Sequence, residues 1–331
     1  MARGNGATRL LRAATTAVSV LVFLAVDGEG ARAQQNAYLL DLLAGGTGVS
    51  LGGSPGVPAL ARPRTPLEGD FAEQQLRFER VRAARIDTRF GIKQLFRDAE
   101  LSYPAAEVFL RIFKRERQLE LWVRPHDAET FSLLKTYGIC ALAGELGPKR
   151  GQGDGQTPEG FYVIDFFNPQ SEFYLSLHVN YPNRSDAILG RRERLGGDIF
   201  IHGGCKTEGC LAVTDESIKE LYWIAVEARS GGQTRIPVHI FPARLDAEEM
   251  QRLDVVFAGE PELRRFWRNL RPGYDYFEQH RKLPDIRVNS LGAYRLAGEP
   301  EHGPDDPAVA NGQAVQTGSG AAPTAGNRDR R

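Results

Sequence analysis

The chain has 331 residues, of which 41% are hydrophobic and 25% are charged, and these are ordinary values for a globular protein. They exclude a collagen, a fully disordered chain and a disulfide-dense small protein, and the length predicts one or two domains. The 42 basic and 42 acidic residues balance, so the overall charge gives no argument for a nucleic-acid partner.

Residues 1–33 have the pattern of a secretory signal peptide. A basic start is followed by an apolar run at 13–26, and the sequence Ala-Arg-Ala at 31–33 offers small residues for a cleavage site. The apolar run is shorter than the roughly 20 residues that a transmembrane helix needs. We therefore expect export to the periplasm with no stable membrane insertion after cleavage, and an uncleaved N-terminal anchor is the alternative.

Two further segments are predicted to precede the main domain. Residues 34–67 are predicted to be a Gly/Pro-rich linker. Residues 68–104 are predicted to be a helical lead, in which Phe71, Phe78 and Val81 are the apolar points of a charged helical stretch at 71–85.

From about residue 105 the pattern becomes typical of β-strands and predicts a mostly β domain over 105–243. Short runs rich in Val, Ile, Phe and Tyr alternate with turn residues. The predicted strands are 108–113, 119–123, 131–137, 160–167, 173–181, 198–202 and 236–241.

A helix is predicted to begin at Thr214, a residue type that favours the start of a helix. The apolar residues that follow recur three and four positions apart, as one face of a helix requires. They are Ile218, Leu221, Tyr222 and Ala225.

The rest of the chain is predicted to be a helical appendage over 244–296, most clearly after Pro261. Residues 297–331 are expected to be a disordered tail, because from position 299 onwards there is no Leu, Ile, Met or aromatic residue. The predicted fold class is therefore mostly β with flanking helices.

The stretch 198–222 carries the most chemical information. His202 ends an apolar strand, and Cys210 stands shortly before the predicted helix. A neighbouring imidazole or a helix N-terminus lowers the pKa of a thiol and makes it nucleophilic. Free backbone amides at Gly209 and Cys210 can bind a developing oxyanion. These residues favour a cysteine nucleophile with a histidine base, as in acyl transfer.

Three other interpretations fit the same residues. Cys205 and Cys210 can form a structural disulfide, because exported chains usually pair their cysteines. His202, Cys205 and Cys210 can bind zinc, although structural zinc sites usually have a fourth ligand. Both thiols can also be buried apolar side chains. Cys140 makes the number of cysteines odd, so at least one is not paired within the chain.

Two more histidines fall in predicted strands. Either His178 or His239 can orient His202, serve as an alternative base, or be an ordinary strand histidine.

The stretch resembles the active-site motif of the YkuD-type L,D-transpeptidase family, in which His-Gly at a strand end is followed by Ser/Thr-x-Gly-Cys. The matching residues are His202-Gly203 and Thr207-x-Gly209-Cys210. The short distance from the histidine to the cysteine is similar to that of the YafK-like branch. That branch is also similar in the stretches LGPKR at 146–150, PEGFY at 158–162 and IHGxC at 201–205, and the resemblance extends over about 80–290.

The resemblance implies an L,D-transpeptidase-like β-sandwich catalytic domain with a cysteine nucleophile. Cys210 would attack a peptide carbonyl of a peptidoglycan stem, His202 would take its proton, and the amides of Gly209 and Cys210 would bind the oxyanion. The thioester would then pass to an amine or to water. The resemblance implies no cofactor and no metal.

Four residues are expected to contact the substrate. Gly203 and Thr207 belong to the motif, and Lys149 and Arg150 lie in a Gly-rich loop that the family resemblance includes. Peptidoglycan stems are anionic, and Arg binds carboxylates in a fork. Solvated loop charges are the other interpretation of Lys149 and Arg150.

One position departs from most of the family. Ala212 stands where most members have Arg two residues after the cysteine, and the YafK-like branch is similar in lacking that Arg. The branch is associated with hydrolysis of the link between peptidoglycan and a covalently attached outer-membrane lipoprotein. A hydrolase (amidase) is therefore the alternative to a transferase, and a catalytically silent peptidoglycan-binding protein is the alternative of another class. A Cys205–Cys210 disulfide that silences the nucleophile is a further hypothesis.

Overall fold

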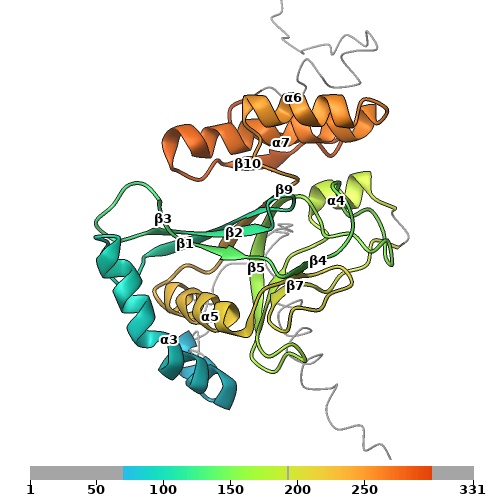
Figure 1. Cartoon of the computed structure of the whole chain (residues 1–331). Coiled ribbons are helices and arrows are strands. Elements are labelled where there is room, and N and C mark those ends of the chain that lie inside the picture. Colours follow the sequence, from blue (N-terminus) through green and yellow to red (C-terminus); the bar gives the residue numbers. More distant parts are fainter. Residues whose placement is uncertain (1–69, 192–193, 300–331) are drawn as a thin grey trace, which may run out of the picture. The chain divides into compact units, whose positions relative to one another are not determined.

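The computed structural model describes residues 70–191 and 194–299 (Figure 1). The predicted signal peptide and linker, and the predicted tail from residue 300 onwards, lie outside the described residues. Within the described ranges, no helix has both the length and the apolar character needed to cross a bilayer.

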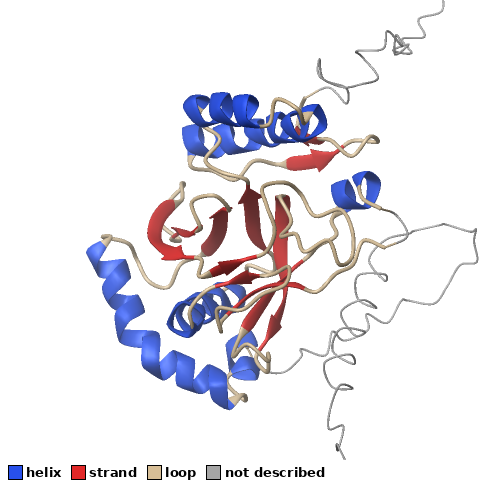
Figure 2. Ribbon diagram, turned by 45° about the vertical axis from the view of Figure 1, so that its right-hand side comes forward, coloured by secondary structure: helices blue, strands red, loops and turns tan. Residues whose placement is uncertain are grey.

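The strands of the described chain form one mixed sheet of nine strands, and a separate hairpin lies near the C-terminus. Figures 1 and 2 show that the large sheet is curled. The predicted fold class, mostly β with flanking helices, is confirmed. In order across the sheet the strands are β3 (Ser132–Gly138), β2 (Gln118–Arg124), β1 (Glu107–Phe113), β9 (Ile236–Phe241), β5 (Gly160–Asn168), β6 (Ser176–Val179), β7 (Ile199–His202), β8 (Leu211–Ala212) and β4 (Ala141–Leu142).

All seven predicted strands are present, and the largest difference is at β6, which is shorter than the predicted 173–181. The sequence missed β4 and β8, which have two residues each and therefore show no periodicity. These short strands exist because β8 pairs in parallel with β7 and antiparallel with β4.

The main core lies between the sheet and α5 (Asp215–Ser230). Thr214 caps this helix by accepting a hydrogen bond from the Ser217 amide at 3.2 Å. The predicted face is confirmed, since Ile218, Leu221, Tyr222 and Ala225 are all buried. They belong to the same apolar cluster as Leu177, Ile201 and Leu211 of the sheet, so α5 covers one face of β6, β7 and β8.

The helical lead consists of α2 (Phe71–Gln75) and α3 (Glu79–Asp98), which packs along the outer side of α5 (Figures 1 and 2). The predicted stretch 71–85 is therefore broken near residue 77, and the second helix runs further than predicted. Phe71 and Phe78 pack against the core, as their apolar spacing suggested.

The C-terminal part contains more than helices. α6 (Ala247–Val256) lies within the predicted helical appendage, and α7 (Pro261–His280) begins at Pro261, where that prediction was clearest. β10 (Ile286–Val288) and β11 (Tyr294–Leu296) form a hairpin that was not predicted. Trp267 and Leu270 of α7 form a second apolar cluster with Phe113 and Phe241 of the large sheet. A short helix, α4 (Arg184–Leu189), follows β6.

Candidate active site

The pairing of two strands places His202 and Cys210 on one face of the sheet. β7 and β8 run parallel, with Ile201 opposite Leu211 and His202 opposite Ala212. Side chains alternate between the two faces of a strand. Ile201 and Leu211 are fully buried in the α5-covered core. His202 and, one residue before Leu211, Cys210 therefore lie on the opposite face of the sheet.

The His202 ring is buried and oriented. Its Nδ1 lies 2.6 Å from the carbonyl oxygen of Gly203, and its ring stacks on Phe173 with 4.5 Å between the ring centroids. A carbonyl only accepts hydrogen bonds, so Nδ1 carries the proton and Nε2 carries the lone pair of the neutral ring. Burial lowers the pKa of His202, which keeps the ring neutral and able to accept a proton.

Cys210 has a free thiol that is hydrogen-bonded to the backbone of β7 and the residues before it. Its sulfur accepts from the Phe200 amide and donates to the Asp198 carbonyl, each at 3.4 Å. Burial raises the pKa of the thiol, while the Phe200 amide, the Thr207 side chain and the charge of Lys149 act in the opposite direction. The resting sulfur is thus a protonated thiol and needs a base.

The helix N-terminus that the sequence suggested as an influence on Cys210 does not adjoin this residue. The short strand β8 separates Cys210 from α5, which begins at Asp215. The pKa of the thiol is raised, with burial as the largest cause. Burial therefore outweighs the interactions that favour the thiolate.

The two amides predicted to bind an oxyanion converge on one point. The Gly209 and Cys210 amides donate to the hydroxyl oxygen of Thr207, at 3.3 and 2.7 Å. Two N–H groups aimed at one acceptor are the arrangement that an oxyanion needs. In this structure Thr207 supplies that acceptor.

The loop between His202 and Cys210 is fastened by a disulfide that the sequence did not predict. Cys140, directly before β4, is bonded to Cys205. The hypotheses of a Cys205–Cys210 disulfide and of a zinc site that includes Cys205 are therefore wrong, because the sulfur of Cys205 is already bonded to Cys140. Across the described ranges, no group of three or more His, Cys, Asp or Glu residues is placed to hold a metal ion.

Asp215 holds the same loop next to the disulfide. The Gly204 amide donates to Asp215 Oδ1 at 2.9 Å. A Cβ atom at Gly203 would lie 2.4 Å from that oxygen, so the motif needs glycine there. Gly204 and Cys205 both have positive φ, which lets the chain turn tightly within the loop.

Lys149 and Arg150 lie in a loop beside the nucleophile, but both are held by internal ion pairs. The Lys149 ammonium is buried and lies 2.6 Å from Asp154 Oδ1. Arg150 lies 3.4 Å from the buried Asp186. The structure therefore brings the charge of Lys149 near Cys210 without leaving it free in solvent, and it does not place Arg150 against the thiol.

This loop is braced by a buried charge pair that the sequence analysis missed. Lys114 Nζ lies 3.0 Å from Glu159 Oε1 and donates to the carbonyls of Gly147 and Thr157. Glu159 also accepts from Trp267 Nε1 at 2.8 Å. The sequence placed Lys114 in a charged turn, and no local pattern marks such a residue as buried.

The other two histidines differ in their surroundings. His178 pairs with Phe200 of β7 and lies 2.6 Å from Asp165, on the face that carries His202. His239 is buried between the rings of Phe109 and Phe161, and burial lowers its pKa to about 3. His239 is therefore a core residue, whereas His178 borders the site.

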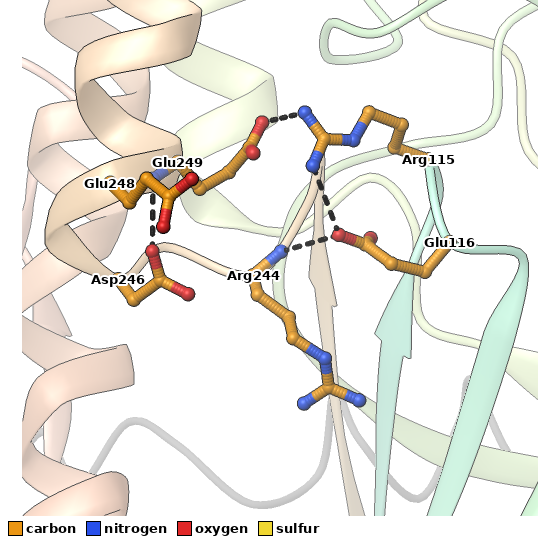
Figure 3. Close-up of a pocket in the computed structure, with 6 residues that line it drawn as sticks. All are labelled: Arg115, Glu116, Arg244, Asp246, Glu248 and Glu249. Carbon is orange, nitrogen blue, oxygen red and sulfur yellow. Dashed lines mark hydrogen bonds and ion pairs between the residues drawn. The ribbon is translucent and has the colours of Figure 1, made fainter.

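A hollow of about 220 Å³ lies away from these residues, where α6 meets the β1–β2 turn (Figure 3). Its cations are paired: Arg115 contacts Glu249 and Glu116, and Arg244 lies 2.8 Å from Glu120. The close-up shows Glu116 between Arg115 and the Arg244 backbone. These ion pairs fasten α6 to the sheet.

Comparison with known proteins agrees with this site. The profile of the L,D-transpeptidase catalytic domain, YkuD, matches residues 109–240, which include His202 and Cys210. YafK of Escherichia coli (strain K12), which is provisionally named an L,D-transpeptidase, is 38% identical over 183 residues. That match covers 55% of this chain and 70% of YafK.

Two solved structures are similar at low scores. A mutant of Pgp2, a helical cell shape determining protein from Campylobacter jejuni, is 21% identical with a TM-score of 0.32, and the match covers 47% of this chain and 56% of that structure. Bd1075 of Bdellovibrio bacteriovorus is 23% identical with a TM-score of 0.31, covering 52% of this chain and 63% of Bd1075. This chain thus spans little more than half of the Pgp2 structure.

The assignment rests on sequence, since TM-scores this low do not define a fold. The domain profile falls on the sheet that carries the site, and the identity to YafK extends over most of that protein. The chain belongs to the L,D-transpeptidase family that carries the YkuD domain.

Proposed function

We propose that the protein is an exported cysteine acyl-transfer enzyme that acts on peptidoglycan stem peptides in the periplasm. Family membership supports the reaction class. The observation that carries the proposal is the shared sheet face of His202 and Cys210, with the proton of His202 held on Nδ1 by Gly203. The signal-peptide pattern of residues 1–33 supports export.

The first half-reaction forms a thioester on Cys210. Nε2 of His202 takes the thiol proton, and the sulfur leaves the Asp198 carbonyl to attack a peptide carbonyl carbon. The Gly209 and Cys210 amides break their hydrogen bonds to the Thr207 hydroxyl and then donate to the oxyanion. When the tetrahedral intermediate collapses, the C–N bond breaks and the departing amine takes the proton from His202.

The second half-reaction releases the acyl group. An amine or a water molecule loses a proton to His202 and attacks the thioester, and Cys210 is regenerated as a thiol. An amine acceptor gives a new peptide cross-link, and water gives hydrolysis. Both use the same thiol, imidazole and amides.

The four residues that were predicted to contact the substrate have different roles. We infer that Gly203 allows the close turn after His202, and that Thr207 exchanges with the substrate oxyanion. Lys149 acts through its charge, which favours the thiolate form of Cys210. Arg150 contributes by holding its loop to the buried Asp186.

Hydrolysis is the second candidate activity, and position 212 favours it. Ala212 is fully buried and paired between His202 and Ala141, in the place where most of the family has Arg. The substrate would then be the link between peptidoglycan and an attached outer-membrane lipoprotein, as in the branch that this sequence resembles.

The decisive experiment is a mass-spectrometric muropeptide profile of purified sacculi incubated with the protein. Cys210→Ala, checked for folding by circular dichroism, is the control. New links between stem peptides that need Cys210 indicate a transferase, and loss of attached peptide remnants indicates a hydrolase. Binding to sacculi by both proteins, with no chemical change by either, would replace the enzyme proposal with a silent binding protein.

A further inference from the structure

The outer face of α3 carries two large apolar side chains that nothing in the described chain covers. The inner face is buried through Val81, Ile92 and Phe96. On the outer face, Ile86 is 60% exposed and Phe90 is 70% exposed. They are four residues apart and therefore lie side by side on one turn.

Basic side chains accompany this pair. Arg82, Arg89, Lys93 and Arg97 are all exposed, and with Ile86 and Phe90 they follow the helical spacing of one stripe. We call these six residues the α3 stripe. The stripe combines positive charge with exposed apolar surface.

The hydrogen-bond and ring partners of the α3 stripe cations are neutral, and the charge of Lys93 also acts on the Glu227 carboxylate of α5. Arg82 donates to backbone carbonyls, and Arg97 donates to Gln94. Arg89 lies over the Phe90 ring, and Lys93 lies over the Tyr103 ring.

Among the acids of α3, Glu79 shares the helical spacing of the stripe, three residues before Arg82, whereas Asp87 and Asp98 lie outside it. Asp87, the acid in the middle of α3, is bonded to Lys219 at 2.9 Å, and Glu79 and Asp98 stand at the helix ends. The positive charge of the stripe is thus largely uncompensated by α3 itself.

A second exposed apolar pair, on α6, lacks this combination. Val255 and Val256 of α6 are 71% and 67% exposed. The nearby Arg252 is paired with Glu248 and Glu249, so that surface carries no free positive charge of this kind.

We propose that the α3 stripe docks the protein on an anionic lipid bilayer, with α3 lying in the plane of the interface. Helices with basic residues beside exposed Phe and Ile bind such surfaces, because the apolar side chains enter the interface while the cations meet lipid headgroups. The proposal does not depend on the catalytic one.

Other occupants fit these residues less well. A second copy placed face to face would bring the same cations together. Hydrated anionic polymers, such as a glycan or a nucleic acid, match the charges but give Ile86 and Phe90 no apolar contact. The apolar run at 13–26, which is predicted to meet a membrane during export, precedes α3 in the sequence.

The test places a fluorescent reporter in the α3 stripe of the whole chain. Phe90→Trp is incubated with phosphatidylcholine vesicles, with or without phosphatidylglycerol as a minor anionic component, that contain brominated acyl chains. The parent chain supplies the background of its own tryptophans, and Val256→Trp is the matched control on α6. Both sites are highly exposed, so neither substitution disturbs the core.

We expect the fluorescence of the Phe90→Trp variant to be quenched severalfold more with anionic than with neutral vesicles, and salt at about 0.5 M to remove most of that difference. Adding Arg82→Gln, Arg89→Gln and Arg97→Gln should also remove it, whereas Arg265→Gln on α7 should not. Whole-chain flotation will be compared for Ile86→Ser/Phe90→Ser and for Val255→Ser/Val256→Ser. Only the Ile86→Ser/Phe90→Ser substitutions should weaken flotation with the vesicles.

Three results would overturn the proposal. The first is equal quenching at positions 90 and 256. The second is a Phe90→Trp spectrum that changes with protein concentration and not with lipid, which would indicate a second copy. The third is charge-dependent binding to purified sacculi, with no lipid quenching at position 90.

Discussion

The buried thiol of Cys210 is expected to be a slow nucleophile towards simple alkylating agents. Because burial raises its pKa, the rate of iodoacetamide labelling should keep rising beyond about pH 9, whereas an ordinary thiol has a pKa of about 8.5 and levels off sooner. Cys140 and Cys205 are bonded to each other, so one label per chain is expected, and none in Cys210→Ala. A plateau below about pH 8 would show that the thiol is activated before substrate binds.

Substitutions at Thr207 test whether its hydroxyl arranges the Gly209 and Cys210 amides. Thr207→Val removes the acceptor shared by Gly209 and Cys210, whereas Thr207→Ser keeps it. A hydrogen bond is worth about 0.5–1.5 kcal/mol, so we expect kcat to fall roughly tenfold in the valine variant and to change little in the serine variant. Equal loss in both variants would assign the effect to the methyl group or to the fold.

His239 is expected to make stability depend on pH. Its pKa is about 3 in the folded protein and about 6.5 when unfolded, so the unfolded chain binds the proton more readily. The stability that the neutral ring contributes is complete above about pH 6.5. It is lost as the pH falls towards about 3, and the loss reaches about 5 kcal/mol. Urea unfolding at several pH values should show a shallower acid loss for His239→Phe than for the parent. The same slope in both proteins would contradict this assignment.

Among the elements, the loop between His202 and Cys210 depends on the Cys140–Cys205 disulfide. The Cys140–Cys205 bond closes a loop with a sequence separation of 65, so replacing both residues by Ser should lower the free energy of unfolding by about 4 kcal/mol. The double variant should also lose activity at room temperature, because the loop between His202 and Cys210 then loses its covalent anchor and keeps only the hydrogen bond from Gly204 to Asp215 at that point.

Single variants separate anchoring from thiol chemistry. Cys140→Ser leaves Cys205 free, five residues from the nucleophile, and the two can then pair. We expect this variant to be inactive when oxidised and to regain activity with dithiothreitol, whereas the Cys140→Ser/Cys205→Ser protein should not respond to reductant. A full response of the double variant would show that reductant acts elsewhere.

The elements also show how far the sequence could predict this site. Periodicity predicted the long strands and α5, and the sequence singled out His202 and Cys210, which lie on one face of the sheet. The sequence could not predict the Cys140–Cys205 disulfide. The pairing of β4 with β8 brings the two cysteines close, and these strands are too short to show a periodic pattern. Burial of Lys114 was missed for a related reason, since its partner Glu159 is distant in sequence.

At the scale of the molecule, a path of buried hydrogen bonds and one ion pair connects α7 to the loop that contains Lys149 and Thr157. Trp267 donates to Glu159, and Glu159 accepts from the Gly147 amide and pairs with Lys114. Thr157, in the same loop, donates to the carbonyl of Cys210 at 3.3 Å. The C-terminal helices therefore support the loop beside the nucleophile, in addition to covering one side of the sheet.

Breaking this path should affect both stability and catalysis. Trp267→Phe keeps an aromatic ring in the cluster but removes the donor to a buried carboxylate, which is worth about 1.5–3 kcal/mol. Lys114→Met leaves the Glu159 charge buried without its ion-pair partner and should cost more, about 3–5 kcal/mol. Tyr274→Phe, which removes a hydroxyl from the same helix and cluster, is the matched control.

Local measurements in the loop that contains Lys149 and Thr157 separate support of that loop from general destabilisation. In Trp267→Phe, hydrogen exchange should speed up in residues 144–158 at a temperature where the protein remains folded, and kcat should fall severalfold. The alkylation rate of Cys210 should change with it, because Lys149 and Thr157 act on that residue from the same loop. If stability falls while exchange in the loop and the alkylation rate stay at the level of Tyr274→Phe, then α7 stabilises the sheet without positioning the site.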